Sequence, residues 1–319
     1  MVKNMTRLSE EEKQYLKYQI YRFRYDDPWI SNKKVAKLLD RSISTINRYA
    51  KQAEEGGIIL NPSLKLKPHP QFKAALLSFE NKYRALDELK ARKEIRFICL
   101  YHGDWDFRVT YDAPIDFTEI PGHIKTVADG VIGPGISPRV EYLSWERCFE
   151  FMEHFLEEKE VQKSEFDHQP CVPEWDEEDW QLYYYFLPNV RKSFKELREE
   201  TLISWRKYQE WKKNLTAYCT ITTGFFPEGY LGYNDMTLCF QTRYEKYIAD
   251  LFSLMPTSSL FFRIGDYFLA NIFIPKEYDK LPRVYDVIFQ LLDRGIISDY
   301  RDGYGVIAWW NYKDALLGK

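Results

Sequence analysis

The chain has 319 residues, of which 45% are apolar, and a formal net charge of −3. A chain of this length exceeds what one hydrophobic core usually supports, so we expect two or more domains. No apolar run approaches the ~18 residues of a membrane span, and the first residues lack the apolar segment of a signal peptide. The 5 cysteines are scattered without a Cys-x-x-Cys pair, which indicates free thiols. We therefore predict a cytoplasmic protein that does not bind a membrane.

Positive charge is concentrated at the start of the chain. Residues 1–68 hold 14 Lys and Arg against 8 Asp and Glu, whereas residues 145–181 hold 3 against 13. A basic module on a body of low net charge is typical of nucleic-acid binding, because lysines and arginines displace the counterions around phosphates. Uneven charge also arises by chance in chains of this size, so this asymmetry alone does not decide the function.

Residues 9–60 predict three helices followed by a short strand. Ser9 and the three glutamates after it begin the first helix, which Asp26-Asp27-Pro28 ends. Ser31 and Ser42 begin the next two helices, since a serine hydroxyl accepts a hydrogen bond from an unpaired amide of the first turn. Gly56-Gly57 ends the third helix, and a strand is expected at 58–60. This order is that of a winged helix-turn-helix, which serves both as a DNA-binding and as a protein-interaction module.

The third helix leaves hydrogen-bonding and cationic side chains outside its apolar face. A helix in the DNA major groove needs such donors near its start. The predicted DNA-binding residues of this segment are Ser42, Ser44, Thr45, Asn47, Arg48 and Lys51. The alternative is an ordinary solvated helix.

The residues that follow predict a basic wing, which completes a winged unit at 1–68. Lys65 and Lys67 alternate with leucines, so a strand would turn both lysines to one side. We predict that they contact DNA phosphates. The alternative is that they keep an edge strand soluble.

Residues 69–144 predict a βαββαβ domain of the ferredoxin-like type. The expected strands are 72–79, 95–101, 105–111 and 139–143, and the expected helices are 83–91 and 120–131. Asp104 and Asp106 are two residues apart at a predicted hairpin, so a strand would place both on one face. They could form an acid–base pair, but an aspartate in a turn commonly makes local hydrogen bonds instead.

Two segments of this half resemble the Lrp/AsnC family of transcription regulators. They are the helix-turn-helix Ser42–Ile59 and the hairpin Gly103-Asp104-Trp105-Asp106, which is similar to the family's Gly-x-Tyr-Asp signature with Trp105 as the aromatic residue. The resemblance covers residues 9–145. It implies a winged helix-turn-helix followed by a ferredoxin-like domain that binds a small effector and dimerises. The effector-binding residues that it implies are Gly103, Asp104 and Asp106.

Residues 145–181 predict an acidic linker that begins with an amphipathic helix. A run of acidic residues is usually a solvated surface or linker. An alternative is that it competes with DNA for the basic module.

The second half repeats the order of elements of the first, which predicts a duplication of the whole two-domain unit. Thr201–Tyr208 matches Ser42–Tyr49 at an offset of 159, and Gly265 matches Gly103 at an offset of 162. We predict a divergent winged helix-turn-helix at 182–226 and a second ferredoxin-like domain at 227–319.

The second copy has lost part of the pattern of the first. Arg206 and Lys207 are its predicted DNA contacts, but Glu210 lies beside them and no Gly-Gly pair ends the helix. Phe268 stands where the first copy has Asp106. We therefore expect weak DNA contact or a structural role for this module, and no effector residue in this half.

No pattern typical of a metal site, a phosphate-binding loop or a hydrolase nucleophile occurs, so we predict no metal, no cofactor and no catalytic residue. One enzyme alternative remains. Siroheme decarboxylases resemble this architecture, with histidines and basic residues around a tetrapyrrole. His102 and His123 are the candidates in that interpretation.

The sequence thus predicts an α+β fold, in which winged helix-turn-helix domains alternate with ferredoxin-like domains duplicated within one chain. The predicted function is sequence-specific transcription regulation, with double-stranded DNA and a small-molecule effector as partners, and not catalysis. The paired domains are expected to form an internal pseudo-dimer, and two chains a homodimer. A tetrapyrrole enzyme and a protein-interaction scaffold are the alternatives on the same fold.

Overall fold

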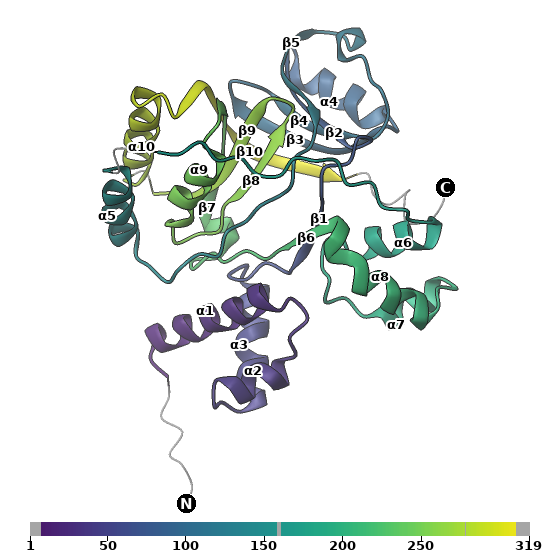
Figure 1. The fold of residues 1–319 in the computed structure, drawn as a ribbon, viewed down its shortest axis with the longest axis vertical. Helices are drawn as coiled ribbons and strands as arrows, with labels where there is room; N and C mark the ends of the chain where they lie inside the picture. Colours follow the sequence, from purple (N-terminus) through teal and green to yellow (C-terminus); the bar gives the residue numbers. More distant parts are fainter. Residues whose placement is uncertain (1–7, 158–160, 278, 311–319) are drawn as a thin grey trace, which may run out of the picture.

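The computed structural model describes residues 8–157, 161–277 and 279–310 and shows two helical modules beside one curled sheet (Figure 1). A two-stranded ribbon, β1 (Ser63–Leu66) with β6 (Cys219–Thr222), lies between the helical modules and the sheet. The arrangement is the predicted α+β architecture, in which winged modules alternate with ferredoxin-like units.

The first helical module contains α1 (Glu10–Asp26), α2 (Asn32–Leu38) and α3 (Ile43–Glu55). The predicted caps are confirmed, because the hydroxyls of Ser9, Ser31 and Ser42 each accept a hydrogen bond from the backbone amide three residues later. The helices pack around Ile46, Ala50 and Ala53, which are fully buried. The strand predicted at 58–60 is wrong, since only an isolated bridge joins Ile59 to Phe225.

The second helical module contains α6 (Glu177–Phe186), α7 (Phe194–Glu200) and α8 (Trp205–Tyr218). Its recognition-like helix begins after Ser204, and Thr201 instead follows α7 and donates its hydroxyl to Leu197 O. The predicted offset of 159 at Thr201 is therefore wrong. Ser31 and Ser193, Ser42 and Ser204, and Gly103 and Gly265 are all separated by 162 residues, so the repeat is more regular than predicted.

The ribbon replaces the two separate wings that the sequence predicted. Ser63 pairs with Thr222 and Leu66 with Cys219, so each half contributes one strand. Leu64 is buried in the core of the second helical module, whereas Lys65 and Thr220 face away from it. A strand alternates its side chains, so the ribbon has one face against the helices and one toward the sheet.

Two four-stranded units join edge to edge to form the eight-stranded sheet, in the order β5-β2-β4-β3-β10-β7-β9-β8. The first unit holds β2 (Lys73–Phe79), α4 (Lys82–Ala91), β3 (Ile95–Gly103), β4 (Phe107–Tyr111), a short 3-10 turn (Phe117–Glu119) and β5 (His123–Val131). The second holds a short 3-10 turn (Tyr230–Gly232), β7 (Tyr233–Thr242), α9 (Glu245–Ser253), β8 (Leu260–Ile264), β9 (Tyr267–Pro275), α10 (Leu281–Asp293) and β10 (Ile297–Trp310). Strands β3 and β10 join the units in the internal pseudo-dimer arrangement.

The sheet curls until its two edges meet. Isolated bridges join Ile132 to Ile264 and Ile136 to Phe261, next to the edge strands β5 and β8. The curl gives the sheet an inner face, where residues such as Leu76, Tyr101, Phe262 and Leu269 form one core. The helices cover the outer faces.

Two predictions for the first unit are wrong. The helix predicted at 120–131 is absent: residues 120–122 form a turn and residues 123–131 form strand β5, which pairs with β2. The outer face of this unit is covered by α4, Phe117 and Ile120. Residues 139–143 are not a strand; there Val140 packs against α1 and exchanges hydrogen bonds with Tyr18 and Tyr21.

The acidic linker begins with α5 (Trp145–Leu156), as predicted, and α5 packs on the outer face of the second unit. Further along, His168 Nε2 lies 2.7 Å from a carboxylate oxygen of Glu245, which is fully buried. Phe166 N donates to the same carboxylate. This part of the linker is therefore fastened to the second ferredoxin-like unit.

Candidate functional site

The predicted recognition surface of α3 is exposed. Ser44, Asn47, Arg48 and Lys51 all lie at the surface. Asn47 Oδ1 accepts a hydrogen bond of 2.9 Å from Asn32, and the Arg48 guanidinium lies 4.8 Å from the centre of the Tyr49 ring. Lys51 pairs with Glu55 at 3.6 Å, an exposed pair that contributes little to stability. The surface is therefore accessible to a partner.

Ser42 and Thr45 are engaged in the cap of α3. The Ser42 hydroxyl accepts from Thr45 N at 3.1 Å and lies 2.8 Å from the Thr45 hydroxyl. Their side chains serve the helix start, whereas the four exposed residues are available for contacts.

The two lysines of the ribbon have different surroundings. Lys67 Nζ donates to Ala217 O at 2.9 Å, so it is satisfied within the ribbon. Lys65 packs against the segment that follows β5, where a Cβ atom at Gly135 would lie 3.0 Å from Lys65 Cγ. Lys65 is therefore directed toward the curled sheet.

The second helical module uses one predicted DNA contact internally. Lys207 forms ion pairs with Asp176 at 2.7 Å and Asp179 at 2.9 Å, which fastens α8 to the start of α6. Arg206 is exposed and lies 3.8 Å from Glu210. Arg206 and Lys207, the two predicted DNA contacts of this module, therefore each lie near at least one carboxylate.

The three predicted effector residues are engaged with parts of the fold outside the hairpin. Gly103 lies against β10, and Asp104 accepts a hydrogen bond from Asp302 N at 2.9 Å. Asp106 accepts from Phe79 N at 2.8 Å and pairs with Lys82 at 2.7 Å. Asp104 and Asp106 therefore bind to different parts of the fold and do not form an acid–base pair.

A cation that the sequence analysis did not single out lies on the inner face of the curled sheet. The guanidinium carbon of Arg108, on β4, lies 5.2 Å, 5.9 Å and 5.3 Å from the ring centres of Phe97, Tyr101 and Phe262. In the part of the chain that the structure describes, Arg108 has no hydrogen-bond acceptor and no carboxylate within ion-pair distance. Removing a charge from water without a partner is costly, so this cation is suited to hold an anion.

Lys65 adds a second positive charge beside Arg108. Burial, and then the charge of Arg108, lower the pKa of Lys65 to about 8 from its ordinary value of 10.5. Within the described ranges no acceptor or carboxylate pairs with Lys65 either. Two neighbouring cations, neither with a carboxylate within ion-pair distance among the described residues, lie at the ribbon end of the sheet.

Asp235, on β7, is the acidic member of the same site. Burial raises its pKa above the ordinary value, and Arg108 acts in the opposite direction. Asn271 donates to Asp235 Oδ1 at 3.4 Å, while Asn271 Oδ1 is buried without a partner among the described residues. We call Lys65, Tyr101, Arg108, Asp235 and Asn271 the Arg108 cluster.

Sequence alternation contains a signal for this cluster. In β4, Phe107, Val109 and Tyr111 are buried toward α4, so Arg108 must occupy the inner face. An arginine is seldom found on a strand with both faces covered unless its charge has a partner, so its presence there indicates a binding role.

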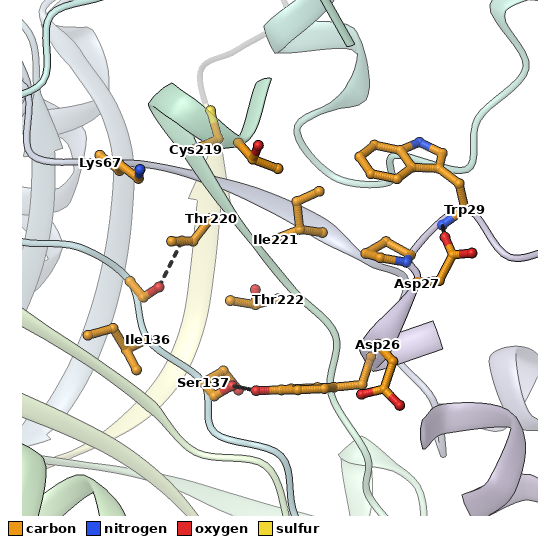
Figure 2. A pocket seen from close by; sticks show the side chains of 14 residues that line it. Asp26, Asp27, Trp29, Lys67, Ile136, Ser137, Cys219, Thr220, Ile221 and Thr222 are labelled. Carbon is orange, nitrogen blue, oxygen red and sulfur yellow. Dashed lines mark hydrogen bonds between the residues drawn. The ribbon is translucent and has the colours of Figure 1, made fainter. Parts of the chain in front are cut away.

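A separate groove lies between α1, the ribbon and residues 135–137, with a volume of about 640 Å³ (Figure 2). Asp26, Asp27, Lys67 and three threonines are among its lining residues. Thr220 lies at this groove (Figure 2), and its hydroxyl donates a hydrogen bond of 2.9 Å to Gly135 O. The groove has few buried charges and separates the helical modules from the sheet.

The two candidate histidines do not converge. His102 is exposed at the end of β3, and His123 lies 3.0 Å from the Thr126 hydroxyl at the start of β5. No group of three or more His, Cys, Asp or Glu suited to a metal ion occurs among the described residues. None of the described helices is long and apolar enough to cross a membrane.

Comparisons with known proteins find likeness in three-dimensional structure alone. No protein-family model and no curated protein matches the sequence. The crystal structure of the siroheme decarboxylase NirDL is similar over 94% of this chain and 96% of that chain, with 11% identity and a TM-score of 0.46. The same enzyme in complex with an iron-uroporphyrin III analogue is similar over 95% and 96%, with 12% identity and a TM-score of 0.44. At this identity the likeness concerns the fold.

The prediction that the chain is not an enzyme is corrected by these comparisons. The two structures found to be similar over almost its whole length belong to an enzyme.

Proposed function

We propose that the chain is an enzyme that binds a tetrapyrrole with carboxylate side chains at the Arg108 cluster. The observation that carries this proposal is the partly buried guanidinium of Arg108, which has aromatic rings around it but no carboxylate within ion-pair distance in the described residues. A carboxylate accepts two hydrogen bonds from a guanidinium in a geometry that matches both groups. Such a ligand would supply the missing counter-ion.

A tetrapyrrole also needs apolar surface for its flat ring. Phe97, Tyr101 and Phe262 line the inner face at Arg108. Strand β10 adds Trp310, which is about half exposed and packs against Phe97 with ring centres 4.3 Å apart. Exposed apolar surface beside a few polar groups is typical of a small-molecule site. The combination supports an amphipathic ligand over a small inorganic ion.

Decarboxylation is the reaction that we propose for this site. When a carboxylate leaves as carbon dioxide, the carbon–carbon bond breaks and its electron pair must take up a proton. Lys65 and Arg108 would hold the carboxylates of the substrate. Asp235, whose pKa burial raises, would hold the proton that replaces the lost group.

Turnover of iron uroporphyrin III tests the proposal. The purified protein is incubated with this compound, and mass spectrometry records products that have lost carbon dioxide. We expect such products with the wild-type chain and a loss of about 100-fold or more in rate with Arg108→Met. The proposal is wrong if the wild-type chain neither binds nor converts the compound.

Double-stranded DNA is a second candidate partner, at the exposed face of α3. The specific observation is the group of four accessible polar side chains described above, with donors near the start of the helix. This binding is compatible with an enzyme on the same chain, because the α3 face and the Arg108 cluster belong to different modules.

A further inference from the structure

We propose that an anion held between Lys65 and Arg108 fastens the β1–β6 ribbon to the curled sheet and thereby fixes the two helical modules relative to the sheet. The inference rests on the anion site of the proposed function and adds its regulation. The bound group would be a carboxylate of the ligand.

The ribbon is firmly connected to both helical modules. Helix α8 ends at Tyr218 and strand β6 begins at Cys219, so no loop separates them. On the side of the first module, Leu60 N donates to Gly224 O at 2.9 Å, and Thr223 donates to Leu60 O at 2.7 Å. A displacement of the ribbon is therefore transmitted to both modules.

The contact of the ribbon with the sheet is weaker. Thr220 donates its hydroxyl to Gly135 O, and the groove of about 640 Å³ opens beside this contact (Figure 2). The residue after Gly135, Ile136, exchanges backbone hydrogen bonds with Phe261 on β8, so this segment is part of the curled sheet. Lys65 is the charged side chain that the ribbon presents next to Gly135.

Charge determines whether this contact is favourable. Lys65 belongs to the ribbon and Arg108 to the sheet, so without a ligand two positive charges repel each other across the junction. Asp235 beside Arg108 offsets this repulsion only in part, because burial raises the pKa of Asp235 and thereby disfavours its charged form. An anion between them replaces this repulsion by two attractions. The partly dehydrated surroundings strengthen both effects, because water screens the charges less. Ligand binding would thus close a junction that is loosened in its absence.

Hydrogen exchange of the ribbon amides, residues 63–67 and 219–222, tests the inference in the full-length protein. Lys65→Met removes the repulsion, so we expect its ribbon to exchange at least about threefold more slowly than that of the wild type without ligand. Lys67→Met is the matched control, because Lys67 directly follows β1 and donates its ammonium group to Ala217 O of α8. Its ribbon should exchange like the wild type.

Saturating iron uroporphyrin III should slow exchange in the ribbon of the wild type and have a smaller effect on the ribbon of Lys65→Met. The inference is overturned if the ligand-free ribbons of the wild type and Lys65→Met exchange at the same rate. It is also overturned if bound ligand protects the sheet strands but not the ribbon. If iron uroporphyrin III does not bind at all, the proposed function fails, while the comparison of ligand-free variants still decides whether charge controls the junction.

Discussion

Gly103 and Gly303 face each other across strands β3 and β10, so closely that a Cβ atom on Gly103 would lie 2.6 Å from the Cα atom of Gly303. The opposite junction repeats the relationship, since a Cβ atom on Gly130 would lie 2.7 Å from the Cα atom of Gly265. Both contacts join the first ferredoxin-like unit to the second. The closed sheet, and with it the position of the Arg108 cluster, therefore depends on backbone contacts that exclude side chains.

Replacing Gly103 by alanine should destabilise the fold by about 2 kcal/mol or more, because the new Cβ atom meets backbone and φ is +147°. Gly295→Ala is the control, since its φ of +64° is also unfavourable but no atom lies within 4 Å of the added Cβ. Thermal unfolding followed by circular dichroism measures both. Equal losses in the two variants would show that the close contact does not matter.

Lys207→Met should loosen the second helical module, because Asp179 would lose its partner in a half-buried ion pair. We expect a loss of about 1 kcal/mol, seen in the denaturant midpoint. Arg206→Met is the matched change on the neighbouring residue, whose side chain is 88% exposed, and it should leave the midpoint unchanged. If Arg206→Met had the larger effect, the structural role of Lys207 would be wrong.

The double variant Arg48→Ala, Lys51→Ala should reduce affinity for genomic DNA fragments and lower the salt dependence of binding by up to about two counterions. The two side chains are exposed on α3, so the fold should not change. Electrophoretic mobility shifts at several salt concentrations provide the measurement, with Arg206→Ala as the control on the second module. Unchanged affinity in the double variant would remove α3 as a DNA-binding surface.

The affinity for iron uroporphyrin III should fall as the pH rises above about 8. The pKa of Lys65 in the folded protein lies at about 8, below its ordinary value of 10.5, so the side chain loses its charge in this range. An anion binds more strongly to the charged form, and the affinity should follow that charge. Lys65→Met should bind more weakly and show less change with pH.

The same depressed pKa affects the stability of the ligand-free protein. The unfolded chain keeps the proton of Lys65 up to its ordinary pKa, whereas the folded chain releases it at about 8. The free energy of unfolding contributed by this residue therefore increases as the pH rises from about 8 to 10.5. The free energy of unfolding of Lys65→Met, measured with urea, should lack this increase between about pH 8 and 10.5. An identical pH dependence in the wild type and Lys65→Met would contradict the lowered pKa of Lys65.

Local signals in the sequence were sufficient for the three helices of the first helical module. Serine caps at Ser9, Ser31 and Ser42 act within one helical turn, so their effect does not depend on the rest of the fold. Residues 120–131 failed for the opposite reason. Their apolar spacing fits a helix. Hydrogen bonding to β2, which local sequence does not encode, makes residues 123–131 a strand instead.

The site could be predicted only in part. The alternation of Lys65 and Lys67 with leucines predicts that both lysines lie on one face, but it favours DNA as their partner and does not indicate that Arg108 lies near Lys65. Arg108 lies 43 positions after Lys65 and Asp235 lies in the other half of the repeat. These residues meet because the sheet curls and the two halves pair, which is a long-range relationship that local patterns do not contain.

Equilibrium binding of iron uroporphyrin III, followed by its absorbance, tests the central claim most directly. The wild type, Arg108→Met and Lys125→Met are compared, the last as an exposed lysine on strand β5 of the same sheet. We predict that Arg108→Met weakens binding by about 10-fold to 100-fold, as expected for the loss of a charged hydrogen-bonding partner, and that Lys125→Met binds like the wild type. Equal affinity of the wild type and Arg108→Met would contradict the account.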